Sequence, residues 1–154
     1  MAESTTELPD LPPLMDQAIL DPLLTQEELF TACDAGRQEN VRAICTTLRL
    51  LEPVRERLGA TGGPRLVAVV GFPFGTLPDE LKQSEAEWAA ARGAEELDVV
   101  PDFTALINLN SGAFAEEIAR ICELGLPVRV VLDMARLSEE LISLAVDAAI
   151  EREQ

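Results

Sequence analysis

Apolar and polar positions follow two alternating patterns along the chain. Short apolar runs, typical of buried strands, lie at 42–47, 65–72, 96–100 and 128–133, with a shorter one at 17–21. Helix-like segments separate and follow them, at 25–37 with Thr25 as cap, 48–58, 78–93, 114–125 and 138–153. This regular alternation predicts an α/β fold, in which a parallel sheet is connected by crossover helices.

The spacing of the apolar runs narrows the fold class. Ala43, Leu66, Leu97 and Val128 begin successive predicted strands, 23, 31 and 31 residues apart. These intervals match the unit of a (β/α)8 barrel, which repeats about every 31 residues in a domain of about 250 residues. With the strand at 17–21, we expect a partial TIM-type barrel of about five parallel βα units. Three helices are expected to end at a glycine: Gly36, Gly93 and Gly125.

The N-terminal segment differs from the rest of the chain. Residues 1–14 are acidic and contain three prolines, which predicts a flexible extended arm, and the barrel-like domain then covers 15–154. This segment has no basic region followed by an apolar one, and no apolar run in the chain approaches about 18 residues. We therefore expect neither secretion nor membrane insertion.

The charge and the residue types restrict the possible chemistry. The net charge is −16 and histidine is absent, so nucleic acid and anionic membrane surfaces are not expected as partners. Without histidine the usual general base and the usual transition-metal ligand are missing, and no metal or cofactor is predicted. Cys33, Cys45 and Cys122 lack a CxxC spacing, which favours free thiols in the reducing cytoplasm.

One carboxylate stands inside a predicted buried strand. Asp98 lies between Leu97 and Val99, and the strand alternation would turn it to the barrel interior, where Arg129 of the next strand can face it. One interpretation is a structural ion pair that fills a barrel layer; the other is a catalytic carboxylate. Replacing Asp98 by Asn is expected to cost on the order of 3 kcal/mol, because it would leave Arg129 buried and unpaired. The alternation along 128–133 places Asp133 on the face of Arg129.

Three further features have simple structural interpretations. Cys45 ends a strand and is typical of a small buried apolar residue, with nothing nearby in sequence to activate a thiolate. The turn at 71–75, GFPFG, lacks the spacing of a phosphate-binding loop and is typical of a tight turn. Lys82, the only lysine, is expected to pair with Glu85 on a solvated helix face.

Several motifs, taken in order, resemble the class I deoxyribose-phosphate aldolases. They are MDQAILDP, RAICTT, VVGFPFG, KQSEAEWAAARGAEELDVV and VRVVLD, and the resemblance runs from Met15 to about Ile150. It implies a parallel βα barrel that cleaves 2-deoxyribose 5-phosphate to acetaldehyde and glyceraldehyde 3-phosphate through a lysine Schiff base, without a metal.

The resemblance also implies roles for single residues. Asp98 matches the catalytic aspartate of the proton relay. Four positions match the substrate site: Asp16, Cys45, Arg129 where the family commonly has lysine, and Asp133 where it usually has glutamate.

The sequence also departs from the family pattern. Gln17 and Ala18 replace a histidine and a threonine, and Thr46 and Thr47 stand where asparagine and proline are common. The Schiff-base lysine belongs to a sixth strand, which the spacing would start at about residue 151 to 159, whereas the sequence stops at Gln154.

Two hypotheses follow. In the first, the chain is a truncated aldolase that is inactive alone, either through a premature stop or because a second polypeptide completes it. In the second, it is a non-catalytic half-barrel that serves binding or assembly. In both cases we expect two unpaired sheet edges, an exposed interior with apolar residues such as Val131, and hence self-association or a complementing chain. A sugar phosphate is the expected small-molecule partner of the completed site.

Overall fold

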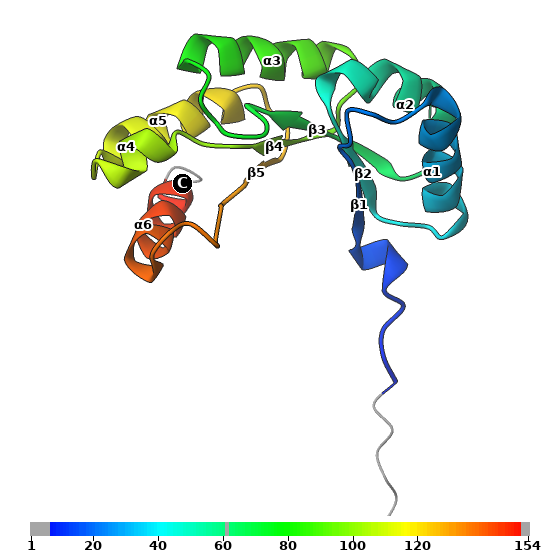
Figure 1. The fold of residues 1–154 in the computed structure, drawn as a ribbon, viewed down its shortest axis with the longest axis horizontal. Helices are drawn as coiled ribbons and strands as arrows, with labels where there is room; N and C mark the ends of the chain where they lie inside the picture. The colour runs from blue at the N-terminus through cyan, green and yellow to red at the C-terminus, as the bar shows by residue number, and fades with distance from the viewer. Residues whose placement is uncertain (1–6, 61, 152–154) are drawn as a thin grey trace, which may run out of the picture.

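The computed structural model describes residues 7–60 and 62–151 as one parallel sheet with helices on its outer side (Figure 1). The sheet order is β1-β2-β3-β4-β5, and every neighbouring pair is parallel. The strands are β1 (Asp16–Ile19), β2 (Ala43–Thr46), β3 (Arg65–Val70), β4 (Glu96–Val99) and β5 (Val128–Val130). The α-helices are α1 (Gln26–Gln38), α2 (Leu51–Leu58), α3 (Asp79–Ala91), α4 (Phe103–Ile107), α5 (Ser111–Cys122) and α6 (Glu139–Ile150).

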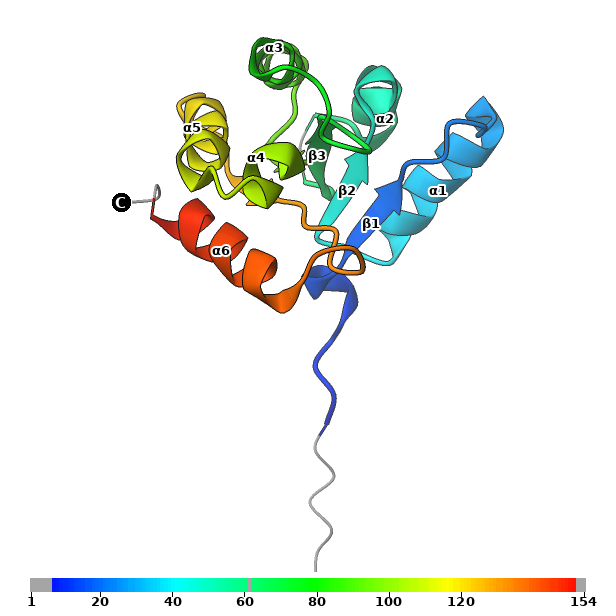
Figure 2. The ribbon, with the colours of Figure 1, turned by 60° about the vertical axis from the view of Figure 1, so that its left-hand side comes forward.

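The strands fan out as in part of a barrel. Figure 2 shows α1, α2, α3, α5 and α6 following one another around the outside of the sheet. The expected partial (β/α) barrel of five parallel units is confirmed, and the strand starts agree with the sequence spacing to within one residue. Within the described ranges, no strand pairs with the outer edge of β1 or of β5.

The two faces of the sheet bury different residues. On the outer face, Ile44, Leu66 and Leu97 are fully buried against the helices, because their side chains alternate with those that point inward. The interior face carries a small apolar cluster around Cys45 and Val67. A third cluster joins α4, α5 and α6 and includes Val130 and Leu132.

Helix ends follow local capping chemistry in part. Thr25 caps α1 as expected, in a reciprocal capping box with Glu28. Gly93 and Gly125 follow α3 and α5 with φ of 91° and 83°, also as expected. The expectation for Gly36 was wrong: α1 runs past it to Gln38, and Gly36 is buried where a Cβ atom would collide with the side chain of Gln17. Its role is close packing rather than helix termination.

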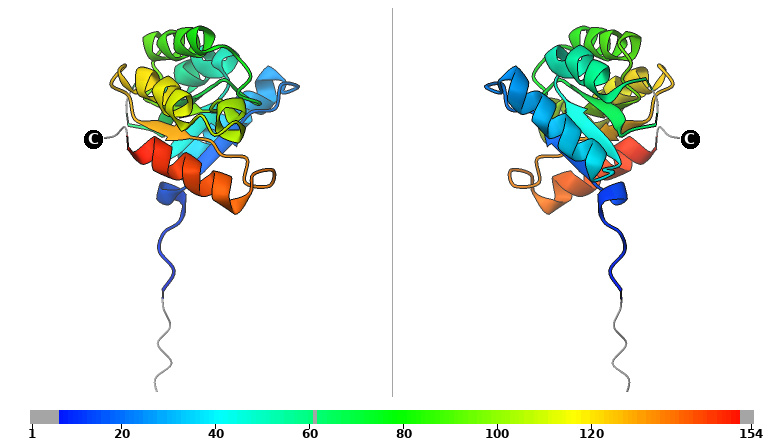
Figure 3. Two further views of the ribbon diagram at one scale, coloured as in Figure 1. Left: turned by 90° about the vertical axis from the view of Figure 1, so that its left-hand side faces the viewer. Right: turned by 90° about the vertical axis from the view of Figure 1, so that its right-hand side faces the viewer.

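The N-terminal arm and two segments refine the expected layout. Of the arm, residues 1–6 lie outside the described ranges, residues 7–11 lead away from the body (Figure 3), and Pro12–Leu14 form a 3-10 turn. Helix α4 was not predicted, because it has only five residues; Asp102 caps it by accepting a hydrogen bond from the Ala105 amide. Leu48–Leu50 form a 3-10 turn before α2, and the expected helix end at 152–153 lies outside the described residues. No helix of the described part is both long and apolar enough to cross a membrane.

Candidate active site

Charged side chains gather on the interior face of the sheet, around Asp98 of β4. The alternation of β4 buries Leu97 and Val99 against the helices, so Asp98 points into the barrel interior as expected. In the β4–β5 register Asp98 lies opposite Arg129. The sheet therefore brings together two residues that are 31 positions apart in the chain.

Arg129 holds both oxygens of the Asp98 carboxylate. Its Nε donates to Oδ1 at 2.8 Å and its Nη2 to Oδ2 at 3.0 Å, the fork geometry that favours arginine over lysine at such pairs. Nη2 also lies 2.5 Å from Oδ2 of Asp16 on β1. The hydrogen bond that Arg129 donates to Asp98 is the main cause that raises the pKa of Arg129. A single guanidinium thus bridges β5, β4 and β1.

A second arginine extends this network at the other end of the strands. Arg42, which directly precedes β2, donates to Asp16 at 2.7 and 2.8 Å and to Glu96 at 3.1 and 2.9 Å. The hydrogen bond from Arg42 is the largest cause that holds the pKa of Asp16 below its ordinary value. Arg42 and Glu96 were not predicted from the sequence. The available signal was the strand alternation, which puts Glu96 on the same face as Asp98.

Cys45 lies beside the catalytic candidate but is not a nucleophile. Its thiol is buried and donates to Oδ2 of Asp98 over 3.4 Å. Burial, and next the negative charge of Asp98, raise the pKa of Cys45 to about 12. The thiol therefore remains protonated near neutral pH and serves as a hydrogen-bond donor, as expected from its lack of an activating base.

Asp133 is placed apart from this network. β5 ends at Val130 rather than at 133, and Asp133 pairs with Arg136 at 3.5 Å in the following turn. Among the described residues, no hydrogen bond or ion pair links Asp133 to Asp98 or Arg129. The expected strand length was wrong, because the strand does not continue to Asp133. Leu132 packs against the cluster of α4, α5 and α6, as the predicted alternation requires.

A cavity of about 630 Å³ lies at the carboxyl ends of β3, β4 and β5. Asp133 and Val131 line it together with the loop that follows β3 and with residues of α4. Active sites of parallel barrels form at this end of the strands, because the βα loops converge there. The structure thus brings four of the five candidate residues into one network and places Asp133 at the neighbouring cavity.

The environment of Lys82 corrects the expectation from the sequence. Lys82 is fully buried, and its Nζ donates to Oε1 of Glu117 on α5 at 2.9 Å. It does not pair with Glu85 on a solvated face, because Lys82, Ala86 and Ala89 form the stripe of α3 that packs inward. The pKa of Glu117 is raised to about 7, chiefly by burial and next by the neighbouring Asp79 carboxylate, while Lys82 lowers it.

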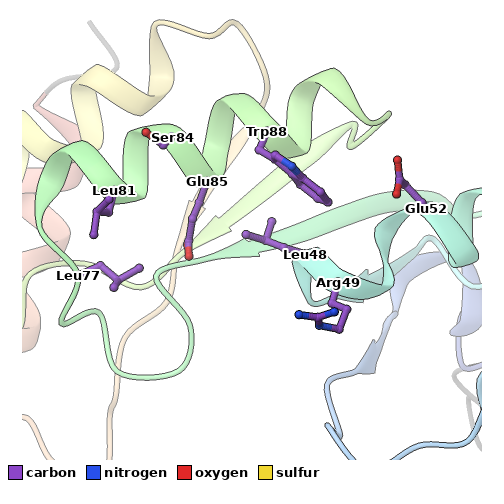
Figure 4. A pocket seen from close by; sticks show the side chains of 8 residues that line it. All are labelled: Leu48, Arg49, Glu52, Leu77, Leu81, Ser84, Glu85 and Trp88. Atoms are coloured by element: carbon purple, nitrogen blue, oxygen red, sulfur yellow. The ribbon is translucent and has the colours of Figure 1, made fainter.

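A groove of about 740 Å³ on the outer face, between α2 and α3, is separate from this site (Figure 4). Leu48, Leu77, Leu81 and Trp88 supply its apolar lining, and none of the candidate site residues lines it. Within residues 7–60 and 62–151, no group of three or more cysteine or acidic side chains is arranged to hold a metal ion.

The fold and the interior network define an incomplete parallel (β/α) barrel of the aldolase type. A solved aldolase structure superposes with a TM-score of 0.88 at 25% identity over 94% of this chain and 65% of its own. A second solved structure is a deoxyribose phosphate aldolase from Aeropyrum pernix, described as a unique tetramer. It superposes with a TM-score of 0.79 at 30% identity over 92% of this chain and 60% of its own.

Sequence relatives lead to the same family. The deoxyribose-phosphate aldolase of Thermosynechococcus vestitus is 35% identical over 146 residues, which cover 94% of this chain and 67% of the relative. That of Trichormus variabilis is 33% identical, over 92% of this chain and 63% of its own. No protein-family model matches the sequence. The chain belongs to the deoxyribose-phosphate aldolase family, and it spans about two thirds of the length of these relatives.

Proposed function

We propose that this chain supplies the first five βα units of a deoxyribose-phosphate aldolase site, with Asp98 in the proton relay. The observation that carries the proposal is the placement of Asp98 on the interior face, where both carboxylate oxygens accept hydrogen bonds from Arg129 and one also accepts from Cys45. A carboxylate fixed in this way keeps its orientation toward a substrate bound at the carboxyl ends of the strands. The proposed substrate is 2-deoxyribose 5-phosphate, and the three cysteines, which form no disulfide, favour a cytoplasmic location.

We further propose that the polypeptide of this sequence does not cleave the sugar phosphate by itself. Imine formation needs a neutral amine that an aldehyde can reach. The only lysine, Lys82, is fully buried and ion-paired with Glu117. Without an imine no electron sink is available for breaking the carbon–carbon bond, so Asp98 has no reaction to assist until another segment provides the amine.

Borohydride trapping tests the amine. The pure chain is treated with acetaldehyde and borohydride, digested, and mapped by mass spectrometry. We expect no ethylation of Lys82 in the native protein, whereas Lys82 reacts in a denatured control. Trapping at Lys82 in the native protein, together with turnover that Lys82→Ala abolishes, would show that this lysine is the nucleophile.

A complementation assay tests the role of Asp98. The chain is co-expressed with the C-terminal third of the Thermosynechococcus vestitus relative, and retro-aldol turnover of deoxyribose 5-phosphate is measured. We expect turnover in the mixture, and a loss of at least about 100-fold in Asp98→Asn, because a positioned acid or base contributes about 10²–10⁴-fold. Turnover that Asp98→Asn leaves unchanged contradicts the proposed relay.

One observation favours assembly as a second function. A groove of about 230 Å³ runs along the outer edge of β5, between α5 and α6, and its lining is apolar apart from Cys122. The exposed Val146 and Ile150 of α6 border it. We propose that a second copy or a complementing chain adds to this edge, because an unpaired strand beside apolar side chains is a template for strand addition.

Sedimentation at micromolar concentration tests assembly. The native chain is expected to form a dimer or larger species, and Val146→Asp should dissociate it. Ser143→Asp adds the same charge to an exposed position of α6 outside the groove and should not. A compact monomer that unfolds cooperatively contradicts the assembly proposal.

A further inference from the structure

The Gly71–Gly75 loop forms one wall of the cavity beside the candidate site. It follows β3, and Pro73, Phe74 and Gly75 line the cavity. Gly71 and Gly75 have φ of 70° and 71°, a region that side chains other than glycine rarely adopt. The amide of Gly75 donates to the carbonyl of Gly71 at 2.7 Å, which closes the loop into a compact turn.

Two residues of α3 support this loop from the side of the outer helices. Oε2 of Glu85 accepts a hydrogen bond from the Gly71 amide at 3.0 Å, and Figure 4 shows the Glu85 side chain projecting from α3 toward the sheet. The stem of Lys82 packs under Gly71 so closely that a Cβ there would lie 3.0 Å from the Lys82 Cε atom. The carbonyl of Val100, at the end of β4, would lie 3.0 Å from the same Cβ.

The ion pair of Lys82 fixes the stem in place. Its Nζ donates to Glu117 of α5 at 2.9 Å, and both side chains are almost completely excluded from solvent. A buried lysine without a partner would be expelled toward water, and its stem would leave the space below Gly71. The chain of contacts therefore runs from α5 through Lys82 to the loop.

We propose that Glu85 and Lys82 are positioning residues, which hold the Gly71–Gly75 loop against the end of β4 and so define one wall of the cavity. Glu85 orients the loop through its hydrogen bond to Gly71, and Lys82 supports it from below. The proposal rests on the proposed function only for what the cavity binds. It also gives a physical reason for the co-occurrence of GFPFG with lysine and glutamate at 82 and 85: the three features form one packed unit.

Amide hydrogen exchange, measured by nuclear magnetic resonance at pH 5.5, tests the proposal without any need for turnover. The quantity is the exchange rate of the Gly71 amide relative to that of Leu97 in β4, which follows global unfolding. Glu85→Ala is expected to raise this ratio at least tenfold. Glu85→Gln retains an acceptor oxygen and should stay within threefold of the native ratio. Glu87→Ala, on the exposed side of the same helix, should not change it.

The support by the stem of Lys82 is measured on the Gly75 amide in the same way. Lys82→Ala removes the stem and is expected to speed exchange at Gly75 at least tenfold relative to Leu97, whereas Lys82→Met keeps a stem of similar length and should not. If Glu85→Ala does not fold, Glu85→Met, which also lacks the acceptor, replaces it. The proposal is overturned if the Gly71 exchange ratio is unchanged in the folded Glu85 variant that lacks the acceptor and the Gly75 ratio is unchanged in Lys82→Ala. This holds whatever the catalytic activity of the chain. A chain with the expected ratios but no complemented turnover refutes the proposed function alone.

Discussion

Lys82→Met removes one half of the buried ion pair between α3 and α5. Lys82 and Glu117 are 0% and 2% exposed, and 2.9 Å separates Nζ from Oε1. Removing one partner of such a pair costs about 3–5 kcal/mol when the remaining charge stays buried. Methionine keeps the apolar stem, so most of the loss is expected to arise from the carboxylate rather than from a cavity.

The loss should depend on pH, because Glu117 can become neutral. Burial raises its pKa to about 7 from an ordinary value of 4.5. A folded-state pKa above the unfolded one means that the folded protein binds more protons between these values. The corresponding stabilisation is complete below about pH 4.5 and is lost as the pH rises through about 7. In Lys82→Met the lowering effect of the ammonium is gone, so the pKa of Glu117 rises further.

Urea unfolding, followed by circular dichroism at pH 5.5 and pH 8.5, measures this difference. We expect Lys82→Met to lose about 3–5 kcal/mol at pH 8.5 and at most about 1 kcal/mol at pH 5.5, where the variant buries a neutral acid. The double variant Lys82→Met/Glu117→Leu has no buried charge and should recover to within about 1 kcal/mol of the native protein at both pH values. An equal loss at both pH values, or a double variant as unstable as the single one at pH 8.5, would refute this reasoning.

Two further predictions concern the interior network. Asp98→Asn should lower the free energy of unfolding by only about 1 kcal/mol, less than the sequence alone suggested. Arg129 is 47% exposed and keeps Asp16 as a partner at 2.5 Å. A loss of 3 kcal/mol or more in urea unfolding contradicts this prediction. In thiol titration with an aromatic disulfide at pH 8, the exposed Cys122 should react in the native state and Cys45 only after unfolding, since its thiol is buried with a pKa of about 12; rapid native labelling of Cys45 would contradict the geometry.

The interior position of Asp98 could be predicted because strand alternation is a local property of the chain. Leu97 and Val99 are apolar neighbours that must face the helices, so Asp98 must face the other way. The partner Arg129 followed from the parallel register once the strands were placed. Arg42 and Glu96 follow the same alternation but lie where the strands begin. The hydrophobic pattern defines strand boundaries less sharply than strand interiors, so these two residues were not predicted.

The environment of Lys82 could not be predicted in this way. Its partner Glu117 lies 35 residues away on a different helix, and only the packing of α3 on α5 brings them together. A lysine three residues before Glu85 fits a solvated face equally well on local grounds. The alanines at 86 and 89 did indicate the buried stripe, but alanine is common on both faces of a helix, so the stripe is visible only when the helix is seen packed.

The hydrogen bonds to Asp98 bear on the role proposed for it in a completed site. A carboxylate has about four acceptor positions, and Arg129 and Cys45 occupy three of them. The side chain is 15% exposed on the interior face, so one position remains for a water or a substrate hydroxyl. Arg129 therefore restricts the rotation of the carboxylate without saturating it. This arrangement suits the proton relay proposed for Asp98, since a group that moves a proton must be held in place and still have one free acceptor position toward the reacting atoms.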